Sequence, residues 1–117
     1  MNLKTGIDIT SVDRFRDLEY SQNLEFYAKS FDKIEIEYCL SFKDPYPIFA
    51  GKFAIKEALQ KVLEEPINFL KIHTRHDSNN APKIEGELKK IYQIELSISH
   101  EKNYAVGIVI VEKIKSF

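Results

Sequence analysis

The chain has 117 residues, 44% hydrophobic and 30% charged, which is ordinary for one globular domain and argues against disorder or a fibrous architecture. Its formal net charge of -1 excludes a global field that would attract nucleic acid, and no run approaches the roughly 20 apolar residues that span a membrane. The first residues lack the apolar segment of a secretory signal. We therefore expect a cytoplasmic protein with a single domain over residues 1–117.

The first predicted element is a strand over residues 3–10, in which Gly6 and Asp8 lie on the face opposite Ile7 and Ile9. A carboxylate here is costly to bury unless a cation or a hydrogen-bond donor meets it. Asp8 is therefore either a ligand of Mg²⁺, which prefers carboxylate oxygens and keeps water for a phosphate-bearing substrate, or a solvent-facing residue of an edge strand. The strand alone favours the second interpretation.

Short helical patterns follow over residues 12–18 and 24–31. Asp32 and Glu35 then have the spacing of a capping box and begin a helix that contains Cys39. We expect this single cysteine on the inner face of the helix, where it can form no intrachain disulfide. No helix start or cationic cluster lies beside it, so we do not expect a reactive thiol.

The longest predicted helix covers residues 47–64, and its proline suits a first helical turn. Lys52 and Lys56 lie four residues apart on one polar stripe, and Glu57 and Lys61 lie four apart on another. The two lysines could form a solvated helix face or supply cations to a phosphate group. Glu57 could bind a metal or form a surface ion pair with Lys61 worth about 0.3–0.5 kcal/mol.

The second half of the chain predicts strands over residues 69–74, 95–99 and 104–111, the last two joined by a turn. Residues 83–92 are ambiguous between the end of a strand and a helical pattern. Both alternating faces of the last strand are apolar, so we expect burial on both sides, with one face covered by another subunit. Helices early and strands late predict an α+β fold, with a small, mostly antiparallel sheet packed against the long helix.

The sequence predicts different roles for the three histidines. His73 and His76 should point to opposite faces of a strand, and further zinc ligands are not evident, so we reject a zinc site. His100 ends a predicted strand beside Ser97 and Ser99. It could accept a proton or donate to a phosphate oxygen, or it could simply satisfy the carbonyl groups of a turn.

Four segments in order carry a family signal: Gly6-Ile-Asp-Ile9, Phe31-Asp-Lys-Ile-Glu35, Ala50-Gly-Lys-Phe-Ala-Ile-Lys-Glu-Ala58 and Ser97-Ile-Ser-His100. Together they resemble the holo-acyl-carrier-protein synthase type of 4'-phosphopantetheinyl transferase, a small trimeric type of α+β fold. The resemblance covers nearly the whole chain, and the Lys-Glu-Ala core of the third segment is its most specific part. It raises the metal interpretation of Asp8 and Glu57 above the alternatives.

The resemblance implies that Asp8 and Glu57 hold Mg²⁺ together with the diphosphate of coenzyme A. A serine hydroxyl of an apo acyl carrier protein attacks the β-phosphate, phosphopantetheine is transferred, and 3',5'-ADP leaves. Glu57 or a metal-bound water would remove the serine proton, and Lys56 would be the cation nearest the developing charge. The implied catalytic residues are Glu57, Lys56 and His100, and the implied coenzyme A ligands are Lys52, Lys56, Lys61 and His100.

The resemblance also implies a carrier-protein surface on the first helix, with Arg14 and Arg16 as partner-binding residues, and trimers with active sites between subunits. Acidic residues are interleaved with the two arginines, so we expect a weaker or more selective carrier interaction. Residues 80–82 are Asn-Ala-Pro where the family has Gly-Lys-Pro, and Lys52 stands where arginine is common. The alternatives are a catalytically weak or inactive module that binds coenzyme A or a carrier protein, and an oligomerisation domain without a ligand. The carrier's pathway is left open.

Overall fold

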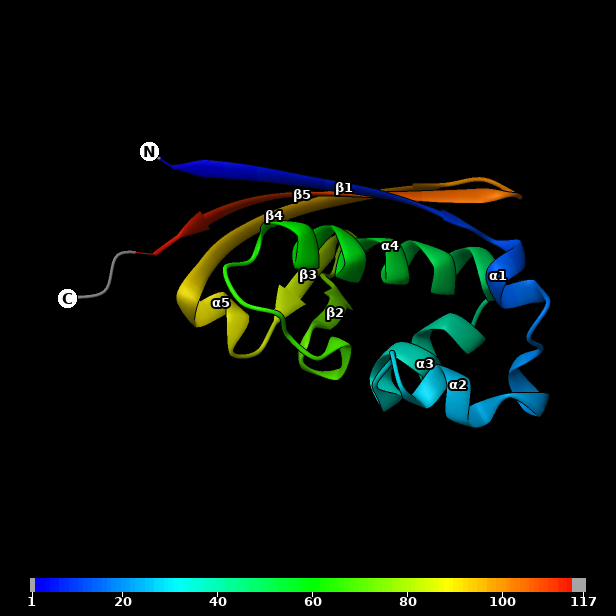
Figure 1. Cartoon of the computed structure of the whole chain (residues 1–117). Helices are drawn as coiled ribbons and strands as arrows, with labels where there is room; N and C mark the ends of the chain where they lie inside the picture. Colours follow the sequence, from blue (N-terminus) through cyan, green and yellow to red (C-terminus); the bar gives the residue numbers. More distant parts are fainter. Residues whose placement is uncertain (1, 115–117) are drawn as a thin grey trace.

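The computed structural model describes residues 2–114 and has an α+β architecture, which confirms the predicted fold class (Figure 1). The first half contains β1 (Leu3–Ser11), α1 (Asp13–Arg16), the 3₁₀ turn η1 (Tyr20–Gln22), α2 (Leu24–Ala28), α3 (Lys33–Leu40) and the long helix α4 (Tyr46–Val62). The second half contains the 3₁₀ turn η2 (Phe69–Lys71), β2 (His73–His76), β3 (Pro82–Glu85), α5 (Leu88–Ile91), β4 (Tyr92–His100) and β5 (Tyr104–Lys113).

The strand pairs within residues 2–114 are all antiparallel. One sheet has the order β1-β5-β4, so that β5 is central and β1 and β4 are its edges, and a second sheet consists of the hairpin β2-β3. Helix α4 runs along one face of the three-stranded sheet, and α1, α2 and α3 gather near the N-terminal end of α4 (Figure 1). The predicted packing of the sheet against the long helix is therefore confirmed.

Two glycines allow the sheet to lie very close to α4. A Cβ atom on Gly6 would collide with the carbonyl oxygen of Ala58, and one on Gly107 would lie 2.8 Å from the backbone nitrogen of Ile55. Gly6 in the first of the four segments is thus explained by packing, because only hydrogen fits between strand and helix. Asp8 is two residues further along the same face of β1 and is therefore directed toward α4.

The buried side chains form two clusters along α4. The first is rich in aromatic residues and includes Phe15, Tyr27 and Phe49, and the single O–H of Tyr27 is shared between two backbone carbonyl oxygens within hydrogen-bond distance. The second is aliphatic and fills the space between the C-terminal half of α4 and the three-stranded sheet. Cys39 belongs to the first cluster, and burial raises the pKa of its thiol to about 12, in agreement with the expected unreactive thiol.

The structure corrects the predicted strand at residues 69–74. Phe69–Lys71 is a 3₁₀ turn, in which the Asn68 side chain accepts a hydrogen bond from the nitrogen of Leu70, and the strand begins only at His73. The capping box of Asp32 and Glu35 is present as predicted. The ambiguous residues 83–92 contain the end of β3, helix α5 and the first residue of β4.

One face of the three-stranded sheet is not covered by residues 2–114. Ala105, Val109 and Val111 of β5 are buried against α4, whereas Ile108 and Ile110 on the outer face are 40% and 41% exposed. Ile7 and Ile9 of β1 extend this outer apolar face. The predicted burial of β5 on both sides is therefore not met within one chain, because no element of residues 2–114 packs on the outer face. None of the helices in these residues has the length and apolar character required to cross a membrane.

Candidate active site

Asp8 is held in a half-buried position at the β1 edge of the sheet. Its Oδ2 accepts a 2.8 Å hydrogen bond from the Thr10 hydroxyl, and its Oδ1 lies 3.3 Å from the ammonium of Lys61. The same ammonium donates to the backbone carbonyl of Ile7 at 2.8 Å. The Asp8 side chain is only 16% exposed. The interpretation of Asp8 as a solvent-facing edge residue is therefore wrong, since a donor and a cation compensate for its burial.

Glu57 lies one helical turn before Lys61 on α4 and is also half-buried. The predicted ion pair between these two residues does not form, because Lys61 is directed to Asp8 instead. Within residues 2–114, the Glu57 carboxylate makes no hydrogen bond or ion pair with another side chain. Asp8 is thus in contact with Lys61, and Glu57, one helical turn before Lys61 on α4, is a second carboxylate that is free of protein partners among the described residues.

Lys56 is buried, and other parts of the chain surround its ammonium. Its ammonium donates to Glu35 Oε1 at 2.8 Å and to the carbonyl oxygens of Ser30 and Phe69 at 2.7 and 2.8 Å. The side chains of Lys56 and Glu35 are both 0% exposed. Burial lowers the pKa of Lys56, and the Glu35 carboxylate opposes this effect. Lys56 is neither a solvated residue nor available to a phosphate group, because all three of its N–H bonds are already used.

Glu35 is a residue whose importance could not be seen in the sequence. Its Oε1 also accepts from the backbone nitrogen of Asp32, and its Oε2 accepts from the backbone nitrogen and hydroxyl of Thr74. One buried carboxylate therefore joins α3, α4 and β2. Glu35 ends the segment Phe31-Asp-Lys-Ile-Glu35, which marks it as a residue of interest in the sequence. A capping box is sufficient to account for a glutamate at that position, so the sequence does not predict the contacts of Glu35 with Lys56 and Thr74.

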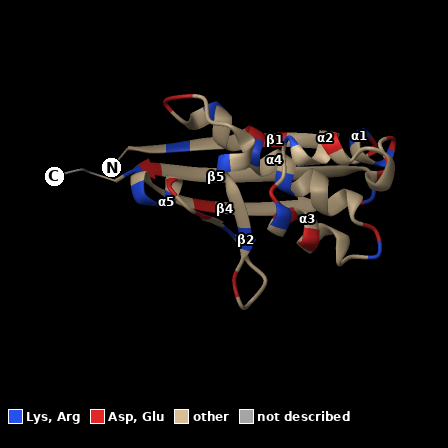
Figure 2. Ribbon diagram, turned by 90° about the horizontal axis from the view of Figure 1, so that it is seen from below, with Lys and Arg blue, Asp and Glu red and all other residues tan. Residues whose placement is uncertain are grey.

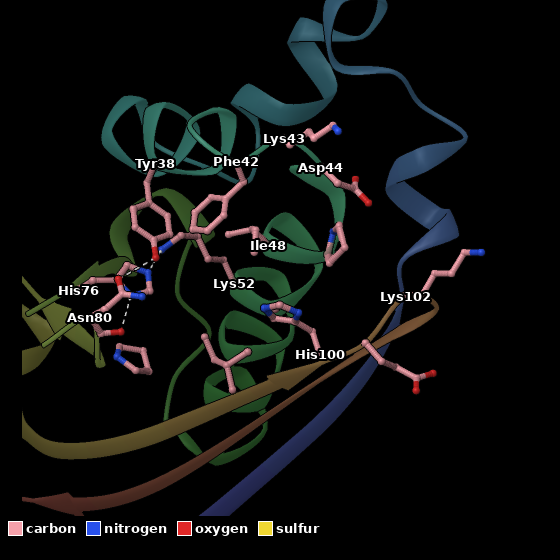
Figure 3. A pocket seen from close by; sticks show the side chains of 15 residues that line it. Tyr38, Phe42, Lys43, Asp44, Ile48, Lys52, His76, Asn80, His100 and Lys102 are labelled. Carbon is pink, nitrogen blue, oxygen red and sulfur yellow. Dashed lines mark hydrogen bonds between the residues drawn. The ribbon is translucent and has the colours of Figure 1, made fainter.

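A pocket of about 590 Å³ lies at the β4 edge of the sheet, between the end of α3, the start of α4, the β2-β3 hairpin and the end of β4 (Figure 3). Tyr38, Lys52, His76, Asn80 and His100 are among its lining residues. His100 is exposed there, and Gly51 allows the close approach of β4, since a Cβ on Gly51 would lie 2.8 Å from Ile98. The predicted residues Lys52 and His100 are thus brought together around one pocket.

Lys52 is 1% exposed, so the expectation of a solvated helix face is wrong for this residue as well. Its ammonium donates to the Thr74 hydroxyl at 3.0 Å, lies 3.1 Å from His76 Nε2, and lies 4.8 Å from the centre of the Tyr38 ring. Burial lowers the pKa of Lys52. From the sequence, His76 is considered only as a zinc ligand and is rejected in that role. The sequence does not predict that His76 lines this pocket.

His73 and His76 have separate environments. The imidazole of His73 lies 2.8 Å from Asp32 Oδ2, and Arg75 shares that carboxylate at 3.0 Å. His76 instead stacks on the Tyr38 ring at a centroid distance of 4.0 Å. The two imidazoles therefore point to different partners, as their spacing on a strand predicts.

The two arginines of α1 are both engaged within the chain. Arg16 makes two hydrogen bonds to the Asp44 carboxylate, at 3.1 and 2.7 Å, and the guanidinium of Arg14 lies 4.4 Å from the centre of the Phe53 ring. Figure 2 shows Lys and Arg interspersed with Asp and Glu along the chain. Their role in binding a carrier protein stays a prediction.

The chain's two groups of candidate residues lie at opposite edges of one sheet. Asp8 and Lys61 meet at the β1 edge, the pocket with Lys52 and His100 lies at the β4 edge, and β5 separates them. A model of the 4'-phosphopantetheinyl transferase superfamily matches residues 4–109. The chain belongs to this superfamily. Both the family resemblance and the enzyme class expected from the four segments are confirmed.

Holo-[acyl-carrier-protein] synthases are among its relatives. That of Thermodesulfovibrio yellowstonii is 39% identical over 110 residues, which cover 91% of this chain and 95% of the relative. That of Halothermothrix orenii is 34% identical over 119 residues, covering 92% of this chain and 95% of the relative.

Two solved structures of such synthases contain bound ligand. The Bacillus anthracis protein, in complex with CoA (3',5'-ADP), superimposes with a TM-score of 0.80 at 26% identity, over 95% of this chain and 96% of that one. The Helicobacter pylori protein, in complex with coenzyme A, gives a TM-score of 0.78 at 31% identity, over 93% of this chain and 100% of that one. These similarities support the fold and the enzyme class of this chain.

Proposed function

We propose that this chain, as a single domain in the cytoplasm, transfers 4'-phosphopantetheine from coenzyme A to a serine of an apo acyl carrier protein, with Mg²⁺ as cofactor. The serine hydroxyl gives its proton to Glu57 or to water, its oxygen forms a bond to the β-phosphorus of coenzyme A, the bond from that phosphorus to the bridging oxygen breaks, and 3',5'-ADP leaves with that oxygen. The observation that carries the proposal is the placement of Asp8 and Glu57 beside Lys61, in a chain of this superfamily.

The residues at the β1 edge fit a magnesium ion that is shared with a phosphate substrate. Residues 2–114 contain no group of three or more His, Cys, Asp or Glu side chains that could hold a metal alone. Mg²⁺ is commonly bound by one or two carboxylates, with substrate phosphates and water completing its shell. Asp8 and Glu57 would hold it, and when bound it would neutralise charge on the diphosphate and orient it.

The chain's own cations have distinct tasks in this proposal. Lys61 orients Asp8 through the 3.3 Å contact and adds positive charge where the diphosphate would lie. Lys52 and His100 bind phosphate groups of coenzyme A in the pocket, with His100 as an exposed donor. Lys56 has no contact with substrate and instead fixes α4 against α3 through Glu35.

We also propose a homotrimer in which each active site combines the β1 edge of one subunit with the β4-edge pocket of its neighbour. Two observations support it: the metal-binding carboxylates and the pocket lie at opposite edges of the sheet, and an apolar outer face that includes Ile7, Ile9 and Ile108 is exposed. A head-to-tail contact of this kind closes into a ring when its rotation angle allows, and the outer faces would then meet at the centre.

The trimer proposal predicts complementation. Asp8→Asn and His100→Ala chains, each nearly inactive alone, should regain about a quarter of the wild-type rate when co-refolded in equal amounts, because some sites then draw both intact residues from different subunits. Ile108→Glu should give folded, inactive monomers by light scattering, whereas Leu24→Glu, at an exposed apolar position on α2, should stay trimeric. A trimer without complementation would contradict shared sites, and a fully active monomer would contradict the trimer.

The proposed reaction is tested by intact-protein mass spectrometry of apo acyl carrier proteins incubated with this chain, coenzyme A and Mg²⁺. A mass gain of one phosphopantetheine that disappears with EDTA is the expected result. Coenzyme A binding by calorimetry without any mass gain, across several carriers, would overturn the proposal in favour of a binding module. The engagement of Arg16 by Asp44 makes that alternative worth testing, because it leaves α1 with less free positive charge.

A further inference from the structure

Lys52 and Lys56 are one turn apart on α4 and both are buried, but their surroundings differ in charge. Lys56 has three hydrogen-bond acceptors, one of which is the Glu35 carboxylate. Lys52 has only the neutral Thr74 hydroxyl and the imidazole of His76 as acceptors among residues 2–114, and no carboxylate lies within ion-pair distance of it. Lys56 is therefore satisfied, whereas Lys52 is a buried cation without a counter-ion in the described part of the chain.

A buried cation without a counter-ion is costly unless an anion is bound beside it. Lys52 retains one N–H bond without a hydrogen-bond acceptor among the described residues, and it lines the pocket at the β4 edge. An anionic group in this pocket could therefore accept a charge-assisted hydrogen bond from Lys52. Figure 3 shows Lys52, His76 and Tyr38 together at one end of the pocket.

The geometry fixes the protonation state of His76 in the ligand-free chain. The Lys52 ammonium can only donate, so His76 Nε2, 3.1 Å away, must accept and carries no proton. His76 Nδ1 then carries the proton and points to the carbonyl oxygen of Asn80 at 3.4 Å. The stacked Tyr38 ring holds the imidazole in this orientation, and its hydroxyl donates to Asn80 Oδ1 at 3.0 Å.

We infer that Lys52 and His76 form a proton-coupled subsite for a phosphate group of coenzyme A, in which His76 takes up a proton when the phosphate binds. The inference rests on the proposed function and adds a residue and a proton to it. The phosphate supplies the missing counter-ion for Lys52, and the added negative charge then favours an imidazolium at His76. The imidazole exchanges its role as acceptor from Lys52 for that of a donor to the phosphate.

The charges around His76 agree with this coupling. Burial and the Lys52 cation lower its pKa in the ligand-free chain, while the carbonyl of Asn80 and the carboxylate of Asp77 act in the opposite direction. The polar and charged groups that face it or share its pocket come from α3, α4, the β2-β3 hairpin and the end of β4: Tyr38, Lys43, Asp44, Lys52, Thr74, Arg75, Asp77, Asn80, His100, Glu101 and Lys102. A bound phosphate would be an additional negative charge among them.

The sign of the pH dependence follows from the proton uptake. A pKa that is lowered in the free chain and raised in the complex makes affinity highest at low pH, and affinity is lost as pH rises through the pKa of the complex. A phosphate monoester has its own pKa near 6, so the window above about pH 7 reports on the protein. Above about pH 7, the ratio of the wild-type Kd for coenzyme A to the Kd of His76→Gln should rise several-fold for each pH unit. One proton limits this rise to about tenfold per unit.

The test is calorimetry of coenzyme A binding to the wild-type chain and to His76→Gln, in buffers of different ionisation enthalpy at pH 7–8. Glutamine keeps an oxygen that can accept from Lys52 but does not titrate in this range. We expect proton uptake in the wild type and its loss in the variant. Equal proton uptake in both proteins would overturn the inference. Failure of the wild type to bind coenzyme A at all would overturn the proposed function as well.

An NMR titration of the wild-type chain keeps the inference testable if the variant misfolds. The chain has 3 histidines, so each imidazole resonance can be followed. The pKa of His76 should rise on binding coenzyme A, and the resonance of His73, which is paired with Asp32 and does not line this pocket, serves as the internal reference. An unchanged pKa of His76 in the complex would overturn the inference. Repeating the titration with 3'-dephospho-coenzyme A identifies the phosphate: a lost shift assigns the 3'-phosphate, and a retained shift assigns the diphosphate.

Discussion

Asp8→Asn and Glu57→Gln are each expected to lower transfer of phosphopantetheine by at least about 10²–10³-fold, while the variants stay folded. Both substitutions remove a negative charge and preserve shape. The amide oxygen of the Asp8→Asn variant would still accept the hydrogen bond from Thr10, and Glu57 has no side-chain partner among the described residues to lose. The loss should therefore fall on the binding of Mg²⁺ and on the orientation of the diphosphate. Turnover by mass spectrometry and thermal unfolding of each variant measure the two effects separately.

A matched control is Glu64→Gln. Glu64 follows α4 and pairs with Lys113 at 3.2 Å, with both side chains more than half exposed. Loss of this surface pair should cost at most about 1 kcal/mol of stability and leave turnover near the wild-type value. Wild-type turnover in either Asp8→Asn or Glu57→Gln would refute the metal-binding assignment. A variant that unfolds would show that the carboxylate supports the fold.

The largest expected effect on stability comes from Lys56→Met, which should lower the free energy of unfolding by about 3–5 kcal/mol. Methionine has a similar volume but leaves the Glu35 carboxylate buried without its cation. The backbone carbonyl oxygens of Ser30 and Phe69 also lose the hydrogen bonds that Lys56 donates to them. The hydrogen bonds from Thr74 and Asp32 to Glu35 would persist but carry no compensating charge. Urea unfolding followed by circular dichroism gives the loss directly.

The double variant Lys56→Met with Glu35→Gln should be less destabilised than the sum of the two single variants, because no unpaired charge is then left in the interior. Lys113→Met is the control at an exposed pair and should change stability by at most about 1 kcal/mol. A Lys56→Met chain with wild-type stability but weakened coenzyme A binding would restore the original prediction that Lys56 contacts phosphate.

The difference between Lys56 and Lys52 shows where sequence reasoning stops. Their spacing on α4 correctly places both side chains on one stripe of a helix. The sequence does not show that α3 and β2 cover that stripe, because the contacts involved join residues far apart in the chain. Lys56 and Glu35 are 21 residues apart, and Glu35 and Thr74 are 39 residues apart. Burial changes the role that a lysine can have, because a buried ammonium requires hydrogen-bond acceptors and a counter-ion. His76 was missed for the same reason.

Local patterns in the sequence determined the elements and the family. Period-two and near-helical spacings predicted β1, α4 and the antiparallel strands, Asp32 and Glu35 predicted the cap of α3, and the four segments predicted the transferase superfamily, because all of these depend on neighbours close in sequence. Tertiary structure alone decided which charges are free. It turned Lys61 to Asp8 rather than Glu57, enclosed Lys56 with Glu35, and put Asp8 and the pocket at opposite edges of one sheet. Those outcomes depend on the order of strands and on close packing between distant segments, which no local spacing encodes.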